Sequence, residues 1–337
     1  MFIDALSSFE ASHGISLPPI ANAAIVALAF GILVLIGSTV FDYMFGWVER
    51  KVIAKVQLRH GPTRVGKFGL LQNLADFIKL FAKEHVIPAR ANRLLFLWSL
   101  PLVAAILTFL IEIIPYGPNI FGVDLSLGIL VAFVLLSFLP IVIFVAGWAS
   151  ANKFASIAAQ RSVIMLISYE VPLFIVVAGV ALLSGSLSFL SIVKAQSHLW
   201  FIALLPIGFV VFFIALMAEL ERPPFDLREA DSELIAGWMT DLSAPLYAMS
   251  LYVDYTRVFL GSLLVAILFL GGWSGPVLPP LVWLMIKVVV IAVFVVIVRA
   301  TTPRMRLDRI MRLGWFWLVP LSIINLAIAF AFVSNII

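Results

Sequence analysis

Long apolar stretches are the main pattern of this 337-residue chain. They run to about twenty residues, the length that a helix needs to cross the hydrocarbon core of a bilayer, and Pro/Gly turns or charged residues separate them. The alternating segments of a membrane β-barrel do not occur in the sequence. We therefore expect an all-α integral membrane protein, a single membrane domain over residues 1–337 with about eight transmembrane helices. The predicted spans are about 20–46, 94–116, 127–148, 162–183, 199–219, 243–270, 280–299 and 315–335.

A helical period of apolar residues marks the loop at 49–93, between the first two predicted spans. One helical face would carry Leu70, Leu71, Leu74, Phe77, Ile78 and Phe81. The opposite face would carry Gln72, Asn73, Asp76, Lys79 and Lys83. This two-sided pattern predicts an amphipathic helix that lies in the membrane interface. Periodicity alone leaves open whether the helix is only a surface anchor.

The distribution of positive charge predicts the orientation of the spans. Of the 22 Lys and Arg residues, 19 fall in or beside the four loops that the predicted spans place on one side of the membrane. Because cytoplasmic loops are enriched in Lys and Arg, we expect these loops inside the cell and both termini outside. The chain is thus predicted to be a multi-pass protein of the plasma or inner membrane. Its isoelectric point near 9.4 follows from this topology, and no nucleic-acid-binding motif accompanies it.

Composition argues against several kinds of cofactor site. The chain has no cysteine, so it holds neither a disulfide nor a cysteine-ligated Fe–S cluster. Its four histidines are scattered without ligand spacing, so no haem or metal site is expected. The segment 61–68 resembles a phosphate-binding loop, but it lacks the Ser or Thr that such a loop offers to Mg²⁺. Residues 1–14 have no basic region, so no signal peptide is expected.

Four acidic residues, besides Glu219 at the very end of the fifth span, fall inside predicted spans, where a charge is costly unless it is neutralised, paired or hydrated. Glu170 sits in mid-span, two residues before Pro172, whose missing N–H frees a carbonyl one turn earlier. This break can admit water, so we expect a carboxyl group that holds and releases a proton. The alternative is a carboxyl that binds a neighbouring helix only for packing. Asp254 has the same interpretation, whereas Asp42 and Glu112 lie nearer the ends of their spans and are expected to reach water.

The loop at 219–241 holds the densest run of acids. It contains seven of the chain's 18 acidic residues: Glu219, Glu221, Asp226, Glu229, Asp231, Glu233 and Asp241. Pro223 and Pro224 are expected to end the fifth span, and Asp226 followed by Glu229 has the spacing of a capping box that opens a short helix. On that helix Asp226, Glu229 and Glu233 would share a face. Such carboxylates either share protons as a coupled set or form a solvated acidic loop against a basic partner subunit.

Four sequence blocks, one for each loop on the positive side, resemble the membrane subunit of respiratory complex I that is called subunit 1 in mitochondria. They occur in the family's order and at its spacing, and the resemblance covers nearly the whole chain. The blocks are ERKVIAKVQLRHGPTRVGKFGLLQNLADFIKLFAKE (49–84), SANKFASIAAQRSVIMLISYEVPL (150–173), ERPPFDLREADSELIAGW (221–238) and RATTPRMRLDRIMRLGW (299–315).

The resemblance implies a membrane subunit that joins the electron-transfer arm of a proton-translocating oxidoreductase to its proton-pumping arm. Its inner loops would form the floor of the quinone chamber, and its buried acids would begin a hydrated polar path toward the pumping subunits. The implied chamber residues are Glu49, Arg50, Arg59, Asp76, Lys79, Arg222, Phe225, Asp226, Glu229, Asp231, Glu233, Arg299 and Arg304. The implied proton path holds Glu170, Glu219, Glu229, Glu233, Asp254 and Arg161.

The resemblance also implies an enzyme subunit that has no complete active site of its own. Quinone, or a similar lipophilic carrier, would be the substrate. No cofactor would be bound covalently, and the electrons would come from an Fe–S cluster in another subunit. The expected partners are that cluster subunit and its neighbour in the peripheral arm, small membrane subunits, antiporter-like pumping subunits and the lipid bilayer, with no nucleic acid.

Three departures from the family pattern bear on the acceptor. Met165 stands where many relatives have Gln, Arg228 where many have Pro, and Val253-Asp254-Tyr255 where relatives commonly have Ala-Glu-Tyr. These changes fit menaquinone or methanophenazine in place of ubiquinone. The alternative function is the corresponding ion-translocating subunit of a membrane-bound hydrogenase or of a methanophenazine-reducing dehydrogenase. A free-standing transporter is disfavoured, because transporters usually have a site at the membrane midplane and here the charge lies mainly on one face.

Overall fold

The computed structural model describes residues 19–334 apart from 119, 122 and 230. The expectation about a signal peptide concerns residues outside this range. Within it the chain is helical, and the β pairing that occurs there is a single bridge between Gly117 and Ile120. The prediction of an all-α protein is confirmed.

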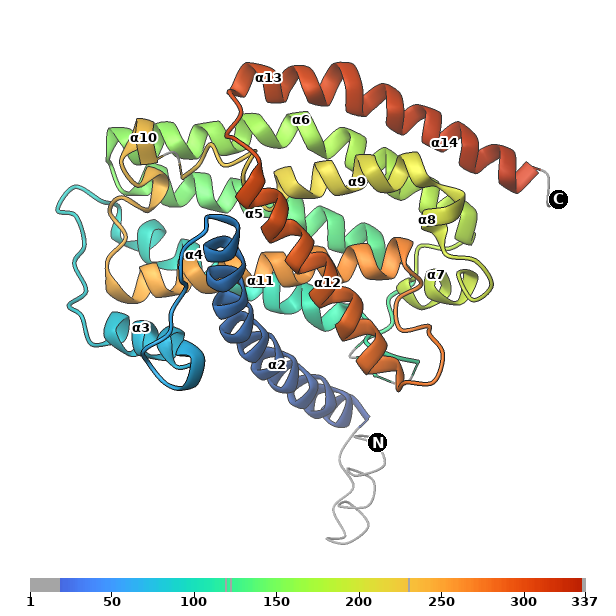
Figure 1. The fold of residues 1–337 in the computed structure, drawn as a ribbon, viewed down its shortest axis with the longest axis horizontal. Coiled ribbons are helices and arrows are strands. Elements are labelled where there is room, and N and C mark those ends of the chain that lie inside the picture. The colour runs from blue at the N-terminus through green and yellow to red at the C-terminus, as the bar shows by residue number, and fades with distance from the viewer. Residues whose placement is uncertain (1–18, 119, 122, 230, 335–337) are drawn as a thin grey trace, which may run out of the picture.

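Seven helical segments of the described part are long and apolar enough to cross a bilayer, which confirms the prediction of an integral membrane protein. Figure 1 shows α6, α9 and α11 running roughly along the long axis of the molecule, with α2 and α12 crossing them obliquely. The seven segments are α2 (Pro19–Val56), α4 (Arg93–Ile113), α5 (Gly128–Ala149), α6 (Lys153–Ser184), α11 (Ala244–Phe269), α12 (Pro280–Thr301), and α13 (Leu307–Arg312), which continues through the π-helical turn η3 (Leu313–Leu318) into α14 (Val319–Ser334).

The fifth predicted span is not one continuous helix. It consists of α8 (Phe201–Leu204) and α9 (Pro206–Glu219), separated at Leu205, whose φ of −123° and ψ of 60° are not helical. Pro206 explains the break, because proline lacks an N–H and pushes the residue before it out of the α region. The expectation of an unbroken span over 199–219 was therefore wrong, although α8 and α9 together cover most of it.

Two helices extend further toward the positive side than hydropathy predicted. Helix α2 continues through the charged residues to Val56, so Glu49 and Arg50 lie on its last turns and not in a loop that begins at 49. Helix α6 begins at Lys153, nine residues before the predicted start of its span, and the side chain of Asn152 caps it by accepting the N–H of Phe154 at 3.0 Å. Hydropathy marks the apolar stretch, whereas the helix ends where its hydrogen bonds end.

The core lies around α11, most of which is buried. Helix α11 packs against α2, α4 and α12, and α6 packs against α5, α9 and α14. Small residues permit close approach where two apolar helices meet in a membrane. At Gly147 of α5, an added Cβ would lie 2.6 Å from the Cβ of Ala159 and 2.8 Å from the carbonyl oxygen of Ala155 in α6. Any larger side chain there would push these helices apart.

The shorter elements gather at the two ends of the bundle. At one end lie α3 (Gln72–Phe81), α10 (Asp231–Leu234) and the 3-10 turns η1 (Lys67–Gly69) and η2 (Gly237–Met239); α7 (Phe189–Ala195) and α8 lie at the other (Figure 1). Helix α3 is the predicted amphipathic helix. The apolar residues Leu74, Phe77, Ile78 and Phe81 are exposed on it, as expected for a helix that meets lipid.

Candidate functional site

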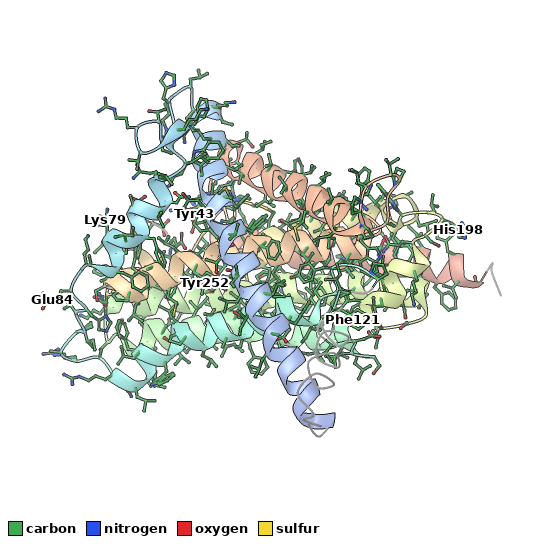
Figure 2. The ribbon with its side chains drawn as sticks, turned by 90° about the horizontal axis from the view of Figure 1, so that it is seen from below. Tyr43, Lys79, Glu84, Phe121, His198 and Tyr252 are labelled. Atoms are coloured by element: carbon green, nitrogen blue, oxygen red, sulfur yellow. The ribbon has the colours of Figure 1, made fainter. Side chains whose placement is uncertain are left out.

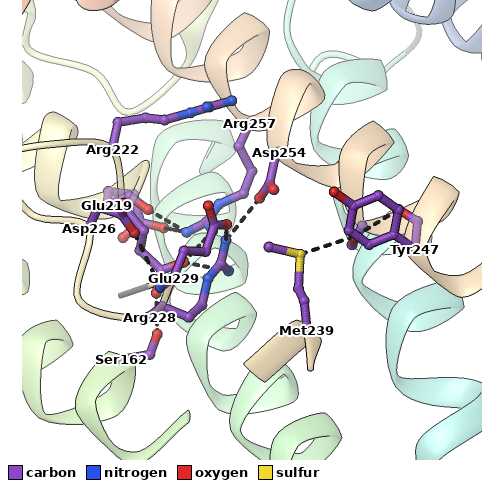
Figure 3. A network of polar contacts seen from close by, with 12 residues as sticks. Ser162, Glu219, Arg222, Asp226, Arg228, Glu229, Met239, Tyr247, Asp254 and Arg257 are labelled. Atoms are coloured by element: carbon purple, nitrogen blue, oxygen red, sulfur yellow. Dashed lines mark hydrogen bonds and ion pairs between the residues drawn. The ribbon is translucent and has the colours of Figure 1, made fainter. Parts of the chain in front are cut away.

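Two buried arginines organise the carboxylates that follow α9. Arg228 lies in the loop at 220–230 and Arg257 lies on α11, and each side chain is only 1% exposed. Between them sits Glu221, with one carboxylate oxygen 2.5 Å from Nη1 of Arg228 and 2.7 Å from Nη1 of Arg257. Figure 3 shows this cluster at the junction of the acidic loop and α11. Because buried charges are tolerated only when paired, the two arginines and Glu221 need each other.

Arg228 is the centre of the network. Its Nη2 also lies 2.9 Å from Oδ1 of Asp254 on α11 and 3.1 Å from Oε1 of Glu229, and its guanidinium lies 5.0 Å from the ring centre of Trp238. The turn at Gly237 lets the chain fold back onto Arg228, since an added Cβ would lie 1.9 Å from the Arg228 carbonyl oxygen. A single arginine thus contacts three carboxylates from two parts of the chain.

Hydrogen bonds tie this network to the neighbouring helices. The hydroxyl of Ser162 on α6 donates to Glu221, and Nη2 of Arg257 donates to the carbonyl oxygen of Glu219 at the end of α9. The same nitrogen lies 3.8 Å from the carboxylate of Glu219. Helix α6, the end of α9, the acidic loop and α11 therefore meet at one buried polar site.

The charges within the loop shift one another's proton affinity. Burial acts to raise the pKa of Glu221, but Arg228 and Arg257 hold it below its ordinary value. Burial acts to lower the pKa of Arg228, but Glu221, Asp254 and Glu229 hold it above its ordinary value. For Glu229, burial and the nearby Asp254 carboxylate raise the pKa to about 7. Glu229 is therefore a loop carboxyl that can exchange a proton near neutral pH.

A second cluster lies beside the first. Glu49, on the last turns of α2, accepts from Arg299 of α12 and lies 3.4 Å from Nη1 of Arg222. The guanidinium of Arg222 lies 5.7 Å from the ring centre of Tyr255. These contacts join α2, α11, α12 and the acidic loop at the positive end of the bundle.

The acidic loop departs from its predicted form. The backbone N–H of Glu229 does donate to Oδ1 of Asp226 at 3.2 Å, as a capping box requires, and Arg304 holds the other oxygen of Asp226 at 2.9 Å. The helix that follows is only the four-residue α10, which begins at Asp231 and so does not include Asp226 or Glu229. The expectation that Asp226, Glu229 and Glu233 share one helical face was wrong. Each carboxylate binds a different arginine, and these tertiary contacts override the local signal.

The remaining residues implied by the resemblance are not all brought together. Glu233 is 54% exposed and pairs at 2.6 Å with Arg161, which directly precedes Ser162 of the buried network. Arg59 is exposed and binds the side chain of Gln57, and Lys79 is exposed on the side of α3 away from α2 (Figure 2). Phe225 is buried in the core, and the side chain of Asp231 lies outside what the structure describes.

Two predicted acids meet deeper between the helices. Glu170 of α6 and Glu219 of α9 line one small cavity of about 10 Å³, together with Tyr169 and Ser137. That is space for roughly one water molecule. Pro172 lies within α6, which continues past it. The polar groups thus continue from the network into the apolar part of the bundle.

A larger cavity opens beside the network, between α2, α3 and α11. It encloses about 550 Å³. At its polar end Arg50 and Asp76 form an ion pair of 2.7 Å, and Tyr255, which also contacts Arg222, lines it. Most of the other lining residues are apolar: Val40, Met44, Leu74, Phe77, Leu80, Ala248 and Leu251. A pocket of this size and character suits the head and first part of the tail of a lipophilic molecule.

Sequence reasoning missed two members of the network. Arg257 had no predicted role, and Arg228 was named only as a departure from the family pattern. The cost of a charged side chain inside a membrane is the signal that could have found Arg257, because it demands an acidic partner on a neighbouring element. Nothing in the local sequence shows that Arg228 is buried. In the part of the chain that the structure describes, no group of His, Asp and Glu side chains could hold a metal ion.

Known proteins are similar in sequence to this chain over most of its length. The profile of the NADH dehydrogenase family matches residues 28–330. The H subunit of the NADH-quinone oxidoreductase of Dehalococcoides mccartyi (strain CBDB1) is 44% identical over 299 residues, which are 88% of this chain and 84% of the relative. The H subunit of the F(420)H(2) dehydrogenase of Methanosarcina mazei is 40% identical over 315 residues, 88% of this chain and 90% of the relative.

Proposed function

This chain belongs to the NADH dehydrogenase family, and from that premise we propose that it is the membrane subunit of a complex I-type proton-translocating oxidoreductase. It forms part of the chamber for a lipophilic electron acceptor, a quinone or a similar carrier, and the start of the polar path that couples electron transfer to proton movement. Its partners are the Fe–S cluster subunit and its neighbour in the peripheral arm, and the membrane subunits that pump protons. It lies in the plasma or inner membrane with both termini outside.

The juxtaposition of the cavity and the buried network carries this proposal. The cavity admits an apolar molecule between α2, α3 and α11, and Tyr255 and Arg50 line its polar end. Tyr255 adjoins Arg222, which pairs with Glu49. A head group that gains negative charge on reduction would act on these arginines first, and through them on the carboxylates that the arginines stabilise.

Protonation of Glu229 links reduction of the acceptor to the movement of protons. Glu229 contacts Arg228 and, with its pKa raised by burial and by Asp254, can gain or lose a proton near neutral pH. A change of charge at the acceptor shifts that equilibrium, and Arg228 conveys the change to Glu221 and Asp254. Glu219 and Glu170 then continue the path into the bundle. Glu233 and Arg161, which pair at the surface, take no part in this path.

Glu229→Gln in the intact complex tests the coupling role. Reduction of the acceptor should continue, while the number of protons translocated per electron falls, because Gln cannot exchange a proton. Acceptor reduction and proton movement are measured in the same reconstituted vesicles, the proton movement with a pH-sensitive dye. Asp308→Asn is the matched control, an exposed acid on α13 outside the network. If Glu229→Gln leaves the reduction rate and the proton ratio unchanged, the buried network has no coupling role.

The similarity to the Methanosarcina mazei protein favours a second candidate, the corresponding subunit of a dehydrogenase with another electron donor. Hydrogenase-type complexes would keep the carboxylates and use no lipophilic acceptor. Competition binding to the purified complex separates complexes that use a lipophilic acceptor, whatever their electron donor, from hydrogenase-type complexes. Displacement of a quinone-site inhibitor by a quinone supports the acceptor chamber, and complete absence of binding supports the hydrogenase type.

A further inference from the structure

A second large cavity lies at the end of the bundle that also holds α3 and α10 (Figure 1). It encloses about 430 Å³ where α4 and α6 begin and α5 ends. Among the described residues, none lines both this cavity and the one between α2, α3 and α11. The second cavity therefore lies outside the proposed chamber, and the proposed function gives it no role.

The charges around this cavity are positive. Arg90, three residues before α4, and Lys153, the first residue of α6, line it, and no Asp or Glu of the described part does. Within the same part of the chain, neither cation is paired with a carboxylate. Arg161, further along α6, differs in this respect, because it pairs with Glu233 at 2.6 Å. Two like charges thus face one space without a counter-charge, and both would attract an anion that entered it.

Hydrogen bonds hold the helix ends around the cavity in place. The N–H of Asn92 donates to the carbonyl oxygen of Ala149 at 2.9 Å, which ties the start of α4 to the end of α5. The side chain of Asn152 caps α6 at Phe154, and its amide donates to Asp241 at 3.2 Å. Asp241 itself does not line the cavity. The cavity is therefore formed before a ligand binds, and it adjoins the end of the acidic loop.

Apolar side chains lead from this cavity along the spanning helices. Trp148 lines the cavity and is 60% exposed. Further along α5, Ile141 and Phe138 are exposed at helical spacing from Trp148. Leu94 and Trp98 are likewise exposed one turn apart on α4, which packs against α5. Tryptophan is typical of the zone between lipid head groups and acyl chains. The cavity thus lies at head-group level, next to an apolar face of α4 and α5.

We propose that this cavity binds the head group of an anionic phospholipid, with its phosphate between Arg90 and Lys153 and its acyl chains along α4 and α5. Basic pockets between membrane helices recognise such head groups, and a cavity of about 430 Å³ has room for one. A small soluble anion would match the charges but would leave the apolar face uncovered, so the structure favours a lipid. Through Asn152 and Asp241, the bound lipid would hold α6 against the end of the acidic loop.

Photolabelling of the intact complex tests the site. The complex is placed in nanodiscs of phosphatidylcholine with a trace of phosphatidylglycerol that carries a photoreactive group on one acyl chain, and labelled peptides are mapped by mass spectrometry. We expect labels on the exposed face of α4 and α5. This labelling should fall about fivefold for each positive charge removed in Arg90→Gln and Lys153→Gln, singly and combined. Phosphatidylcholine with the same photoreactive group should label this face weakly in every variant, because its head group has no net charge.

Arg306→Gln combined with Arg309→Gln is the matched control. These exposed cations lie at α13, outside the cavity, so their loss removes the same charge and should leave the labelling unchanged. Equal labelling by the two lipids, or unchanged labelling in Arg90→Gln with Lys153→Gln, would overturn the proposal. Thermal stabilisation of the complex by inorganic phosphate that this double variant loses, without a preference for phosphatidylglycerol, would overturn it in favour of a soluble anion. A carbodiimide cross-link from Lys153 to another subunit, without lipid labelling, would overturn it in favour of an acidic protein surface.

Discussion

The two halves of the acidic loop contain ion pairs of almost the same length in opposite surroundings. In the first half, Glu221 lies 2.5 Å from Arg228, and both side chains are 1% exposed. In the second half, Glu233 lies 2.6 Å from Arg161, with exposed fractions of 54% and 27%. The sequence presents these acids as one continuous run. The two ion pairs cannot be told apart by their distances either. Only the exposed fractions of their side chains distinguish them.

Burial changes what an ion pair means for the protein. At the surface, water and salt screen both charges, so a pair contributes little to stability. In the interior, each charge has given up its hydration and depends on its partner, so the loss of one partner strands the other. The first half of the loop is therefore both the more fragile part and the part whose charges can influence one another strongly.

The largest expected effect comes from Arg228→Met, which keeps the bulk of the side chain and removes its charge. Glu221, Glu229 and Asp254 would lose a shared cation in a buried site. We expect a loss of about 3–5 kcal/mol of stability, visible as a lower yield of assembled complex and an earlier thermal unfolding in detergent. Arg161→Met is the matched control and should change stability by no more than about 1 kcal/mol. Equal effects of the two substitutions would contradict the distinction between the halves.

The next effect is a dependence of stability on pH that Glu229 should confer. Its pKa is raised from 4.5 to about 7, chiefly by burial, so the folded protein disfavours the charged form. The cost of that charge is absent below about pH 4.5, grows as the pH rises toward 7 and is constant above it. The difference corresponds to roughly 3 kcal/mol.

Glu229→Gln should remove this dependence, since Gln does not titrate. Measured as thermal unfolding of the complex between pH 5 and 8, the stability of the original protein should fall relative to the variant as the pH rises. The two curves should then run parallel above about pH 7. A constant offset over the whole range would show that Glu229 does not titrate there, and the loop would lose its candidate for proton exchange.

The sequence predicted the helical membrane fold because hydropathy reports directly on length and burial in lipid. Hydropathy gave wrong helix bounds where another property of the chain decides where a helix breaks or ends. Pro206 divides the fifth span, although the run of apolar residues continues through it. Helices α2 and α6 extend beyond their apolar parts, because a helix can carry charges such as Glu49 outside the bilayer core.

The candidate site could be predicted only as a set of residue types. The resemblance named Glu49, Arg222 and Glu229, and the structure brings them close to one another. The resemblance could not predict which arginine pairs with which carboxylate. Arg228 and Asp254, for example, are 26 positions apart and meet only when the loop packs on α11. Asp42 was expected to reach water, but it is buried and accepts from the hydroxyl of Thr256, 214 positions away, a contact that the sequence hid equally. Long-range contacts of this kind leave no local pattern.

The smallest expected effect concerns Glu233→Gln, and for that reason it is the sharpest test of the comparison. If burial decides the role of each acid, removal of the exposed carboxylate costs no more than about 1 kcal/mol and leaves proton translocation per electron unchanged. Any loss of stability should shrink further at high salt, because an exposed pair is screened. The measurements are those used for Glu229→Gln, in the same vesicles and detergent. A fall in the proton ratio as large as that of Glu229→Gln would show that the acids act as one row after all, with Arg161 as part of it. The division of the acidic loop into a buried half that couples to proton translocation and a solvated half that does not would then be wrong.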